Sequence, residues 1–547
     1  MSARADIRAG ALDGGVWLLD MVVSGRVYRV ASEAMTVSDA AGRTYAYTDG
    51  LADLTVSQSD DPVSTLAVTL DIGEDWALLV ARGIPLVRCR CIVRRYWYGQ
   101  TLDAALVVLS GLSESPQYGA QYEPLTLTIK RDPLEQSGNV LDPLALVDVV
   151  TWPTGHLYAG YEYAQPAEGQ YYPLVIGYPG HIERPPYAVA AVPALLVQHV
   201  HPPTTLTTFA VADQVIHAST VRFLNVTMGR GESRDVKLET DGIGRTVSVI
   251  DLNTPSPSSL PGAAETDEFW CGFTHGQGGI YGPDGVSPLR GAGDVIEYLL
   301  RNRSQIAVDY GRLAAVKEAL NRYQVDTYIG AQVSAWEWLS SELFPLLPVV
   351  VCDGPEGLYL RVVRWDATRA DAVRYLSVER QDIDRVGAVT TFSEPIRNEI
   401  EVEYRGAQNG ATWYARRIVS AEAKIISSVY ETQDDRVRGS YACRLSQAAH
   451  GIRSYSVRCS WTWDHDTADQ IAEDLAARYA TPKRAVQYRG GWDLEAIEPW
   501  DVVAVSDAEL HLADTPAIVQ SRTIGPTGIV LSLILLDHAV HAPRSTI

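Results

Sequence analysis

The fold is decided by a stretch near the C-terminus that reads Leu494-Glu495-Ala496-Ile497-Glu498-Pro499-Trp500-Asp501-Val502-Val503-Ala504-Val505. Its proline indicates a tight turn, and the apolar run that follows indicates a strand. An amphipathic run at 467–480 and a strand-like run at 486–491 precede it, and two further strand-like runs end near Leu536. The sequence therefore predicts a helix that leads into a small barrel of short strands.

The predicted helix and the strands before it complete a fourth domain, residues 389–547. Thr467-Ala468-Asp469-Gln470 has the spacing of a capping box, and Ile471, Leu475 and Tyr479 share one helical face. Upstream, Glu and apolar residues alternate over 398–404, which predicts a half-buried strand. Similar runs occupy 413–419, 424–428 and 454–463.

A third domain, residues 266–388, carries most of the helical signal. Apolar residues at helical spacing predict helices over 294–301 and 309–322. Ser334-Ala335-Trp336-Glu337 is a second capping box, and we expect its helix to be stopped by Pro345 and Pro348. Strand-like runs at 349–352 and 358–365, joined by a glycine turn, predict a hairpin, so this domain is α+β.

The first half of the chain predicts β-structure only. Residues 1–132 contain a set of short alternating runs typical of one barrel or sandwich, in which Leu66, Val68 and Leu70 share a face and residues 97–100 form a turn. Residues 133–265 are rich in Pro, Gly and Tyr and have no helical period, which indicates an inserted β module. The best linker candidate is 256–266.

Composition supports this division. A chain of 547 residues must form several domains, and 46% hydrophobic with 21% charged residues is typical of globular ones. Tyr (28) and Trp (13) far outnumber Phe (6), and alternating Val and Thr favour strands. The expected fold class is mainly β with an α+β portion, in a multidomain chain.

Charge and targeting signals limit the partners. The net charge of −21 disfavours tight binding of nucleic acid, because an acidic surface repels phosphates. The same repulsion would suit a conduit through which DNA slides, although simple solubility explains the charge more readily. Residues 1–10 lack the apolar core of a signal peptide, and no apolar run reaches about 20 residues, so neither a secretion signal nor a membrane span is expected.

The cysteines do not form a recognisable metal or disulfide pattern. Cys89, Cys91, Cys271, Cys352, Cys443 and Cys459 are scattered and lack Cys-x-x-Cys spacing. Cys89 and Cys91 would point to one sheet face, but a metal or cluster there would need two more ligands. Buried small side chains are the favoured interpretation.

Three motifs could carry chemistry, and each has a simpler reading. Asp464-His465-Asp466 could bind a metal or move protons, but at a strand-to-helix junction a helix cap with a solvated His is favoured. His199 and His201 could be half of a metal site, and a pair at a loop edge is favoured. The glycine run 276–282 lacks the Gly-Lys-Ser/Thr ending of a P-loop and is interpreted as a flexible loop. We therefore assign no catalytic, cofactor-binding or metal residue, expect no cofactor, and expect no enzyme.

The order of several motifs resembles the tail hub proteins of long, non-contractile-tailed bacteriophages, which are related to the baseplate hubs of contractile tails and the spike hubs of type VI secretion. The resemblance covers roughly the half of the chain from Gly291 onward. It is carried by residues 292–300, by Trp336-Glu337-Trp338-Leu339 with 343–351 and 357–359, by 397–404 and by 467–536. Two departures stand out: the family's Pro-Gly turn is Pro499-Trp500 here, and residues 171–181 lie outside the minimal hub pattern.

The resemblance implies a structural virion protein at the tail tip. A homotrimer, in which each chain contributes two tube-like β domains, would form a pseudo-sixfold ring that matches the hexameric tail tube or distal tail ring. Expected partners are that hexamer, the tape measure protein and a central fibre or receptor-binding protein, with host-envelope contact during infection. DNA would pass through an acid-lined channel without being specifically bound. Two alternatives stay open: a distal tail ring or fibre adaptor, and a carbohydrate-binding or carbohydrate-degrading virion protein suggested by the many Trp and Tyr residues.

Overall fold

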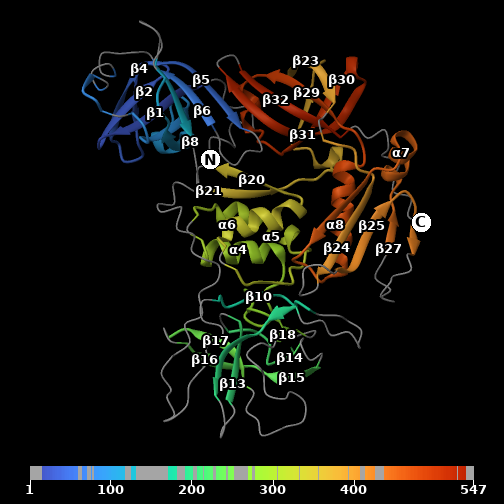
Figure 1. The fold of residues 1–547 in the computed structure, drawn as a ribbon. Helices are drawn as coiled ribbons and strands as arrows, with labels where there is room; N and C mark the ends of the chain where they lie inside the picture. The colour runs from blue at the N-terminus through green and yellow to red at the C-terminus, as the bar shows by residue number, and fades with distance from the viewer. Residues whose placement is uncertain are drawn as a thin grey trace.

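The computed structural model describes most of the chain as three regions that are stacked along one direction (Figure 1). Two β units lie side by side at one end, helices and a mixed sheet lie in the middle, and a further group of strands lies at the opposite end. The fold is mainly β with a small helical portion, as predicted. The described residues are 15–58, 65–70, 76, 79, 81–84, 86–117, 125–130, 170–180, 191–200, 206–212, 215–225, 230–241, 244–251, 269–273, 278–304, 306–331, 333–354, 357–391, 394–406, 413–425, 436–525 and 528–536.

The N-terminal β unit wraps its strands around an apolar core. Its hydrogen-bonded order is β3-β4-β2-β1-β7-β8-β9-β6-β5. β4 and β5 follow each other across Gly50, and because β4 pairs with β2 while β5 pairs with β6, the sheet curls back toward itself. Val68 and Leu70 are buried and the backbone turns at Trp97–Gln100, where Gln100 N donates to Trp97 O (3.2 Å), as predicted. The strands are β1 Val16–Val23, β2 Arg26–Ala31, β3 Met35–Ser38, β4 Thr44–Asp49, β5 Leu51–Gln58, β6 Thr65–Leu70, β7 Arg90–Tyr96, β8 Leu106–Ser113 and β9 Leu125–Lys130.

The C-terminal β unit recruits two strands that precede it by about a hundred residues. β22 pairs in parallel with β30, and β23 pairs antiparallel with β29. The predicted boundary at 388/389 therefore falls inside β23, and we propose that this unit combines 374–391 with 484–536. The boundaries predicted at 132/133 and 265/266 lie outside the described residues, as does the 256–266 linker. The strands are β22 Arg374–Ser377, β23 Ile383–Thr391, β29 Arg484–Gly490, β30 Val502–Asp507, β31 Leu512–Gly525 and β32 Gly528–Leu535.

The middle region packs helices against a mixed sheet. The predicted helices over 294–301 and 309–322 are α4 Ala292–Asn302 and α5 Tyr310–Leu320. In β24 the side chains of Ile400, Val402 and Tyr404 are buried while the intervening glutamates are half-buried, which confirms the predicted alternation. The sheet order is β26-β27-β25-β24-β28, with β24 Glu399–Gly406, β25 Trp413–Ser420, β26 Lys424–Ile425, β27 Arg436–Gly439 and β28 Ser454–Cys459. Helix α7 spans Tyr441–His450, and the predicted hairpin is β20 Val349–Gly354 with β21 Gly357–Val362.

Two helix boundaries differ from the prediction. Helix α8, His465–Tyr479, is capped by Asp464, whose carboxylate accepts from Thr467 N (2.9 Å), so Thr467 is not the cap. The predicted C-terminal barrel is wrong, because within the described residues these strands belong to a sheet that does not close and whose end strand β23 pairs only with β29. The helix packs on β24 and β25, since Ile471 and Leu475 belong to the core of the middle region. Helix α6 Ala335–Trp338 is capped by Ser334 as predicted, but it continues through a π turn into a 3-10 turn that contains Pro345 and ends before Pro348. Proline is tolerated there because it lies in the first turn of the 3-10 segment.

The region at the far end is a two-sheet sandwich, called the insert below. One sheet has the order β12-β13-β17-β16 and the other β11-β18-β14-β15. Phe209, Phe223 and Phe269 contact one another between the sheets at ring-centroid distances of 4.6–5.2 Å. Within the described residues, no helix is long and apolar enough to cross a membrane. The strands are β11 Val192–Pro193, β12 Leu195–Val200, β13 Leu206–Ala212, β14 Thr220–Asn225, β15 Arg230–Asp235, β16 Lys237–Thr240, β17 Thr246–Asp251 and β18 Phe269–Gly272.

Candidate functional site at the joints between regions

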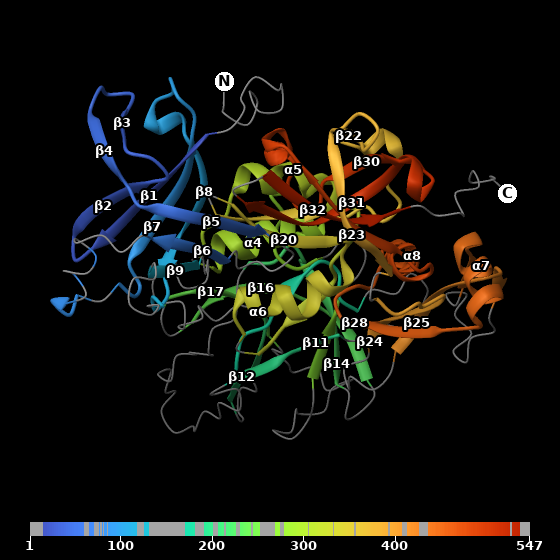
Figure 2. The same ribbon diagram turned by 90° about the horizontal axis from the view of Figure 1, so that it is seen from above.

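The two β units are fused along a seam, defined by the pairing of β5 with β31 and by Trp17, Arg95 and Trp492. Val56 to Gln58 of β5 align antiparallel with Arg522 to Ile524 of β31, so the strands of both units form one continuous sheet (Figure 2). One apolar core also runs through both units and includes Leu19 of β1 and Leu531 of β32. The two units therefore form a single packed body and are not separate domains joined by a linker.

A buried arginine crosses the seam. The Arg95 guanidinium lies 4.4 Å from the Trp17 ring and 4.1 Å from the Trp492 ring, and only 2% of the residue is exposed. Burial lowers the pKa of Arg95 to about 10, although Glu495 opposes this shift, so the group stays charged at neutral pH. A desolvated cation between two indoles contributes about 2 kcal/mol or more to holding them together.

The turn Glu498-Pro499-Trp500-Asp501 is a second joint, between the C-terminal unit and the middle region. Arg361 of β21 contacts Glu498 (2.9 Å) and Asp501 (2.8 Å), and Arg312 of α5 reaches Glu498 (3.1 Å). Burial works against the charge of Arg361, but Asp501 and Glu498 outweigh it and raise its pKa. Trp500 has φ +69°, so a tryptophan adopts the left-handed conformation that the glycine of a Pro-Gly turn would normally supply.

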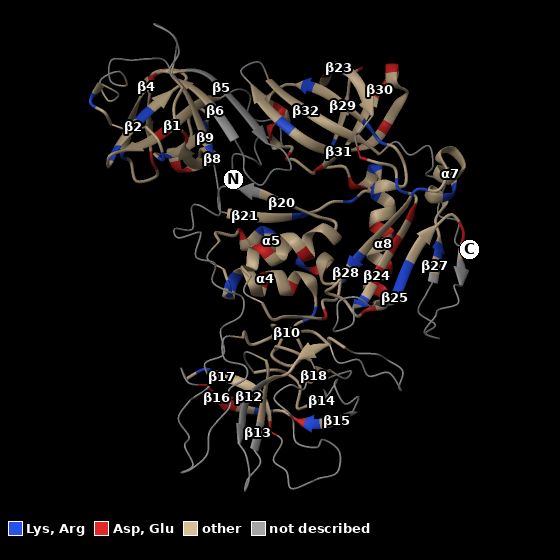
Figure 3. Ribbon diagram, viewed as in Figure 1, with Lys and Arg blue, Asp and Glu red and all other residues tan. Residues whose placement is uncertain are grey.

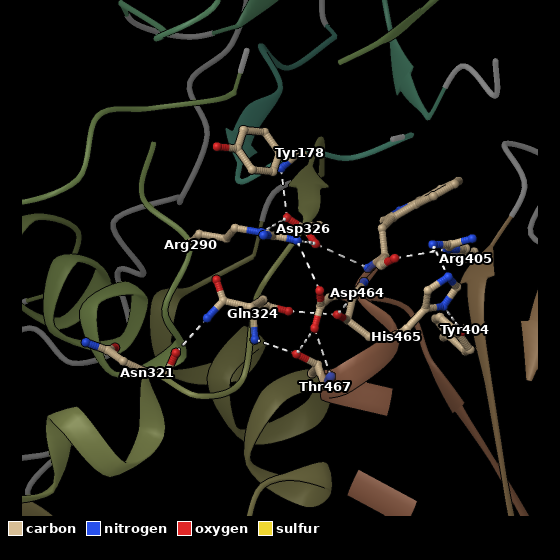
Figure 4. A network of polar contacts seen from close by, with 12 residues as sticks. Tyr178, Arg290, Asn321, Gln324, Asp326, Tyr404, Arg405, Asp464, His465 and Thr467 are labelled. Carbon is tan, nitrogen blue, oxygen red and sulfur yellow. Dashed lines mark hydrogen bonds and ion pairs between the residues drawn. The ribbon is translucent and has the colours of Figure 1, made fainter. Parts of the chain in front are cut away.

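The third joint is the insert clamp, a network of polar contacts around Asp326 (Figure 4). The Asp326 carboxylate is fully buried and accepts from Tyr178 N (2.8 Å) and from both Nε (2.7 Å) and Nη2 (2.9 Å) of Arg290. Burial disfavours the charge of Arg290, yet the bond to Asp326 raises its pKa above the ordinary value. Arg290 also lies 3.7 Å from Asp464, the cap of α8. Three distant parts of the chain thus meet at one ion pair.

His465 belongs to the edge of this network: it is half-buried and both of its ring nitrogens have polar neighbours, which corrects the prediction of a simply solvated His. Its Nδ1 contacts the hydroxyl of Tyr404, and its Nε2 lies 3.0 Å from Nη2 of Arg405. Because a guanidinium only donates, Nε2 accepts, and Nδ1 carries the proton toward Tyr404. The cap interpretation of Asp464 is confirmed, whereas the His holds the start of α8 against β24.

The other motifs fall as follows. Cys89 and Cys91 are buried in the N-terminal core, and burial raises the pKa of both thiols, which fits the interpretation as small core side chains. His199 lies in β12 and His201 lies outside the described residues. Gly278 and Gly279 are packed against other chain segments and are not part of a free loop, which corrects that interpretation, while 276–277 are not described. In the part of the chain described here, no three His, Cys, Asp or Glu side chains are placed to hold a metal ion.

Charges in the middle region are mostly used for contacts between elements. Figure 3 shows acidic and basic residues next to each other on α8, β24 and β25. Arg417 and Arg438 both reach Asp469 of α8, at 3.2 and 2.9 Å, and Glu401 of β24 pairs with Arg416 of β25 at 3.3 Å. The two pairs to Asp469 fix the helix on the sheet, and the Glu401–Arg416 pair joins two neighbouring strands of that sheet.

The residues of the joints were missed by the sequence analysis, although two carried a signal. Asp326 is a lone acid within Val325-Asp326-Thr327-Tyr328-Ile329, which indicates a buried charge with a partner. The period of two places Arg95 on the same face as Cys91 and Val93, and all three are buried. The partners themselves, Arg290 and Trp492, come from distant segments and leave no local pattern.

No family model matches the chain, and no curated protein matches its sequence. Among solved structures, the tail protein from Neisseria meningitidis MC58 aligns over 96% of this chain and 97% of its own at 9% identity, with a TM-score of 0.37. The 43 kDa tail protein of prophage MuSo2 from Shewanella oneidensis aligns over 95% and 96% at 8% identity, with a TM-score of 0.36. A chain of the native gene transfer agent virion aligns over 50% and 84% at 11% identity, with a TM-score of 0.21. Likenesses at this level carry no argument about function.

Proposed function

We propose that this protein is a structural component of a bacteriophage tail: a homotrimeric hub at the tail tip that joins the tail tube or distal tail ring to the tape measure protein and a central fibre. It has no enzymatic role in this proposal. The observation that carries it is the seam. One chain holds two β units side by side in one sheet and one core, so three chains offer six such units to a hexameric partner.

The free edges of the sheet support a closed ring. Within the described residues, β3 pairs only with β4 at one end of the strand order, and β23 pairs only with β29 at the other. Unpaired edges invite association with another chain, and a closed ring removes them all at once. The rigid seam would fix the angle between successive units, which a ring of defined size requires.

The test is the mass of the purified protein by native mass spectrometry, with the 59.8 kDa chain as the unit. Three chains per particle support the hub. Six chains would favour a distal tail ring or fibre adaptor, and a stable monomer at micromolar concentration would overturn the ring altogether. Binding or cleavage of a glycan by the purified protein would instead support the carbohydrate alternative.

The channel supplies a second test. Because the chain carries 67 acidic and 46 basic residues, we expect acids to outnumber bases on the wall that faces the DNA. Electron microscopy of the assembled tail tip would show this wall directly. A basic or apolar lumen would refute the role as a conduit.

A further inference from the structure

The insert is attached through a strand ribbon that is shared between two cores. Strand β10, Leu174–Ile176, pairs antiparallel with β19, Thr327–Ile329. Successive side chains of a strand point to opposite faces, so Leu174 and Ile176 enter the core of the middle region while Val175 enters the core of the insert. The ribbon is therefore a common wall of both regions.

Close backbone contacts hold the ribbon on its other side. Gly279 N donates to Gly177 O (2.8 Å) and Ile280 N donates to Val175 O (3.0 Å). A Cβ at Gly279 would lie 2.0 Å from Val175 O, and one at Gly177 would lie 2.1 Å from Val325 O. Both distances are too short for any other residue, so the segments that lead into and out of the insert touch through their backbones.

The Asp326 ion pair locks this arrangement to α8. Asp326 binds Tyr178, at the end of the ribbon, through its carboxylate, and its N–H donates to Trp461 O (2.7 Å). Further on, Gln324 N donates to Thr467 Oγ1 (2.8 Å), and Thr462 Oγ1 donates to Gln324 O (2.7 Å). Segment 324–326 is thus bonded along its length to the chain that starts α8.

We propose that the insert is a rigid arm, and that the Asp326–Arg290 pair is the lock that couples the arm's orientation to the start of α8. A displacement of the arm is then passed to residues 461–467 and is not absorbed by a hinge. The physical reason is that the fully buried Asp326 carboxylate is held by two N–H groups of Arg290 and also accepts from Tyr178 N of the arm (2.8 Å), while the Arg290 guanidinium lies 4.8 Å from the Tyr178 ring. The arm cannot rotate without taking a donor away from a buried carboxylate. This inference concerns the single chain and does not depend on the proposed function.

Spin labels on the arm and on the middle region test the rigidity. All six native cysteines are buried, so E239C on exposed β16 and I452C, where Ile452 is 65% exposed, would be labelled selectively. Co-expression with an excess of the parent chain restricts the measured distances to one chain in any oligomer. We expect one narrow distance distribution in the parent protein. A broad distribution would overturn the proposal without the need for any further variant.

Removal of the lock tests the coupling. With D326A or R290A the distribution should broaden, and hydrogen exchange at the amides of 464–467 should rise by about tenfold or more, since a buried charge loses its partner. D326N, which keeps the shape, should lie between these variants and the parent, so the comparison survives if the alanine variants fail to fold. R301A is the control, because the exposed Arg301 of α4 contacts Glu297 (2.7 Å) and the Tyr310 ring (4.2 Å), neither of which belongs to the insert clamp. Unchanged distances and unchanged exchange in D326N and D326A would refute the lock.

Discussion

The seam and the insert clamp both join regions that are distant in the sequence, but they differ in what they bury. At the seam, the two β units share one apolar core and one sheet, and the buried guanidinium of Arg95 lies between two indole rings. At the clamp, the insert keeps its own core, and the contact depends on a two-stranded ribbon and a buried ion pair. Apolar burial is non-directional and merges two regions into one, whereas a bidentate ion pair fixes an orientation between regions that stay separate.

The largest expected effects on stability come from core substitutions. They test whether the two β units share one core while the insert has a core of its own. Leu531→Ala, in the core of both β units, and Phe223→Ala, in the core of the insert, should each cost about 3–5 kcal/mol in the free energy of unfolding. Hydrogen exchange should rise in β1 and β7 as well as β32 for the first variant, and only in the insert for the second. If Leu531→Ala affected the C-terminal unit alone, the two units would not be one body.

The seam cation should have the next largest effect. Arg95→Ala removes two cation–π contacts and leaves a buried gap, so we expect a loss of about 2–4 kcal/mol, measured by chemical denaturation. Arg95→Lys should recover only part of the lost stability, because an ammonium group, unlike a guanidinium, has no planar face to stack on the two rings. Arg90→Ala is the control, because Arg90 lies on the same strand β7 and its side chain is exposed. Equal stability of Arg95→Ala and the parent would mean that the seam depends on apolar burial alone.

The pH dependence of stability tests the contact between α8 and the segment that precedes the clamp. This contact is made by the carboxyl group of Asp474 and the hydroxyl of Tyr323. Burial raises the pKa of Asp474 on α8 from 3.8 to about 6, while the hydroxyl of Tyr323 partly offsets this. Between these two values the unfolded chain has lost a proton that the folded chain keeps, so stability falls as pH rises through the window, and the cost persists above pH 6. Asp474→Asn should therefore match the parent at pH 4 and exceed its stability by up to about 3 kcal/mol at pH 7. Parallel stability profiles of the two proteins over this range would contradict the assignment.

The smallest effect concerns the turn joint. Trp500→Gly and Trp500→Ala both remove the indole, but only glycine is free of strain at φ +69°. Glycine should therefore be the more stable of the two by about 1 kcal/mol. The reverse order would mean that the turn relaxes once the indole is gone.

Local sequence patterns were sufficient to predict single helices and strands, but not which strands pair with one another in the sheets. The alternation in β24 and the helical spacing in α4 and α5 were predicted correctly, because each is set by burial of one face. The pairing of β22 and β23 with the C-terminal unit was missed, since the register between strands a hundred residues apart has no local signature. The start of α8 was misplaced by choosing Thr467 over Asp464, whereas Thr467 lies in the first turn and donates to the Asp464 carboxylate through both its N–H and its hydroxyl. The clamp was missed for the same reason as the strand pairings: the run around Asp326 signals a buried charge, but nothing local identifies Arg290, 36 residues away, as its partner.

The pairing of β5 with β31 also determines when, during synthesis of the chain, the N-terminal unit can complete its folding. Ser57 aligns with Thr523, and at roughly 5–20 residues per second a ribosome needs about 25–90 s to make the chain between them. During that interval β5 has an uncovered edge and the N-terminal unit lacks part of its core. The newly made chain is therefore exposed to association with other copies of itself through this edge, and a chaperone that shields strand edges would raise the yield of folded protein more than it would raise the stability of the finished protein.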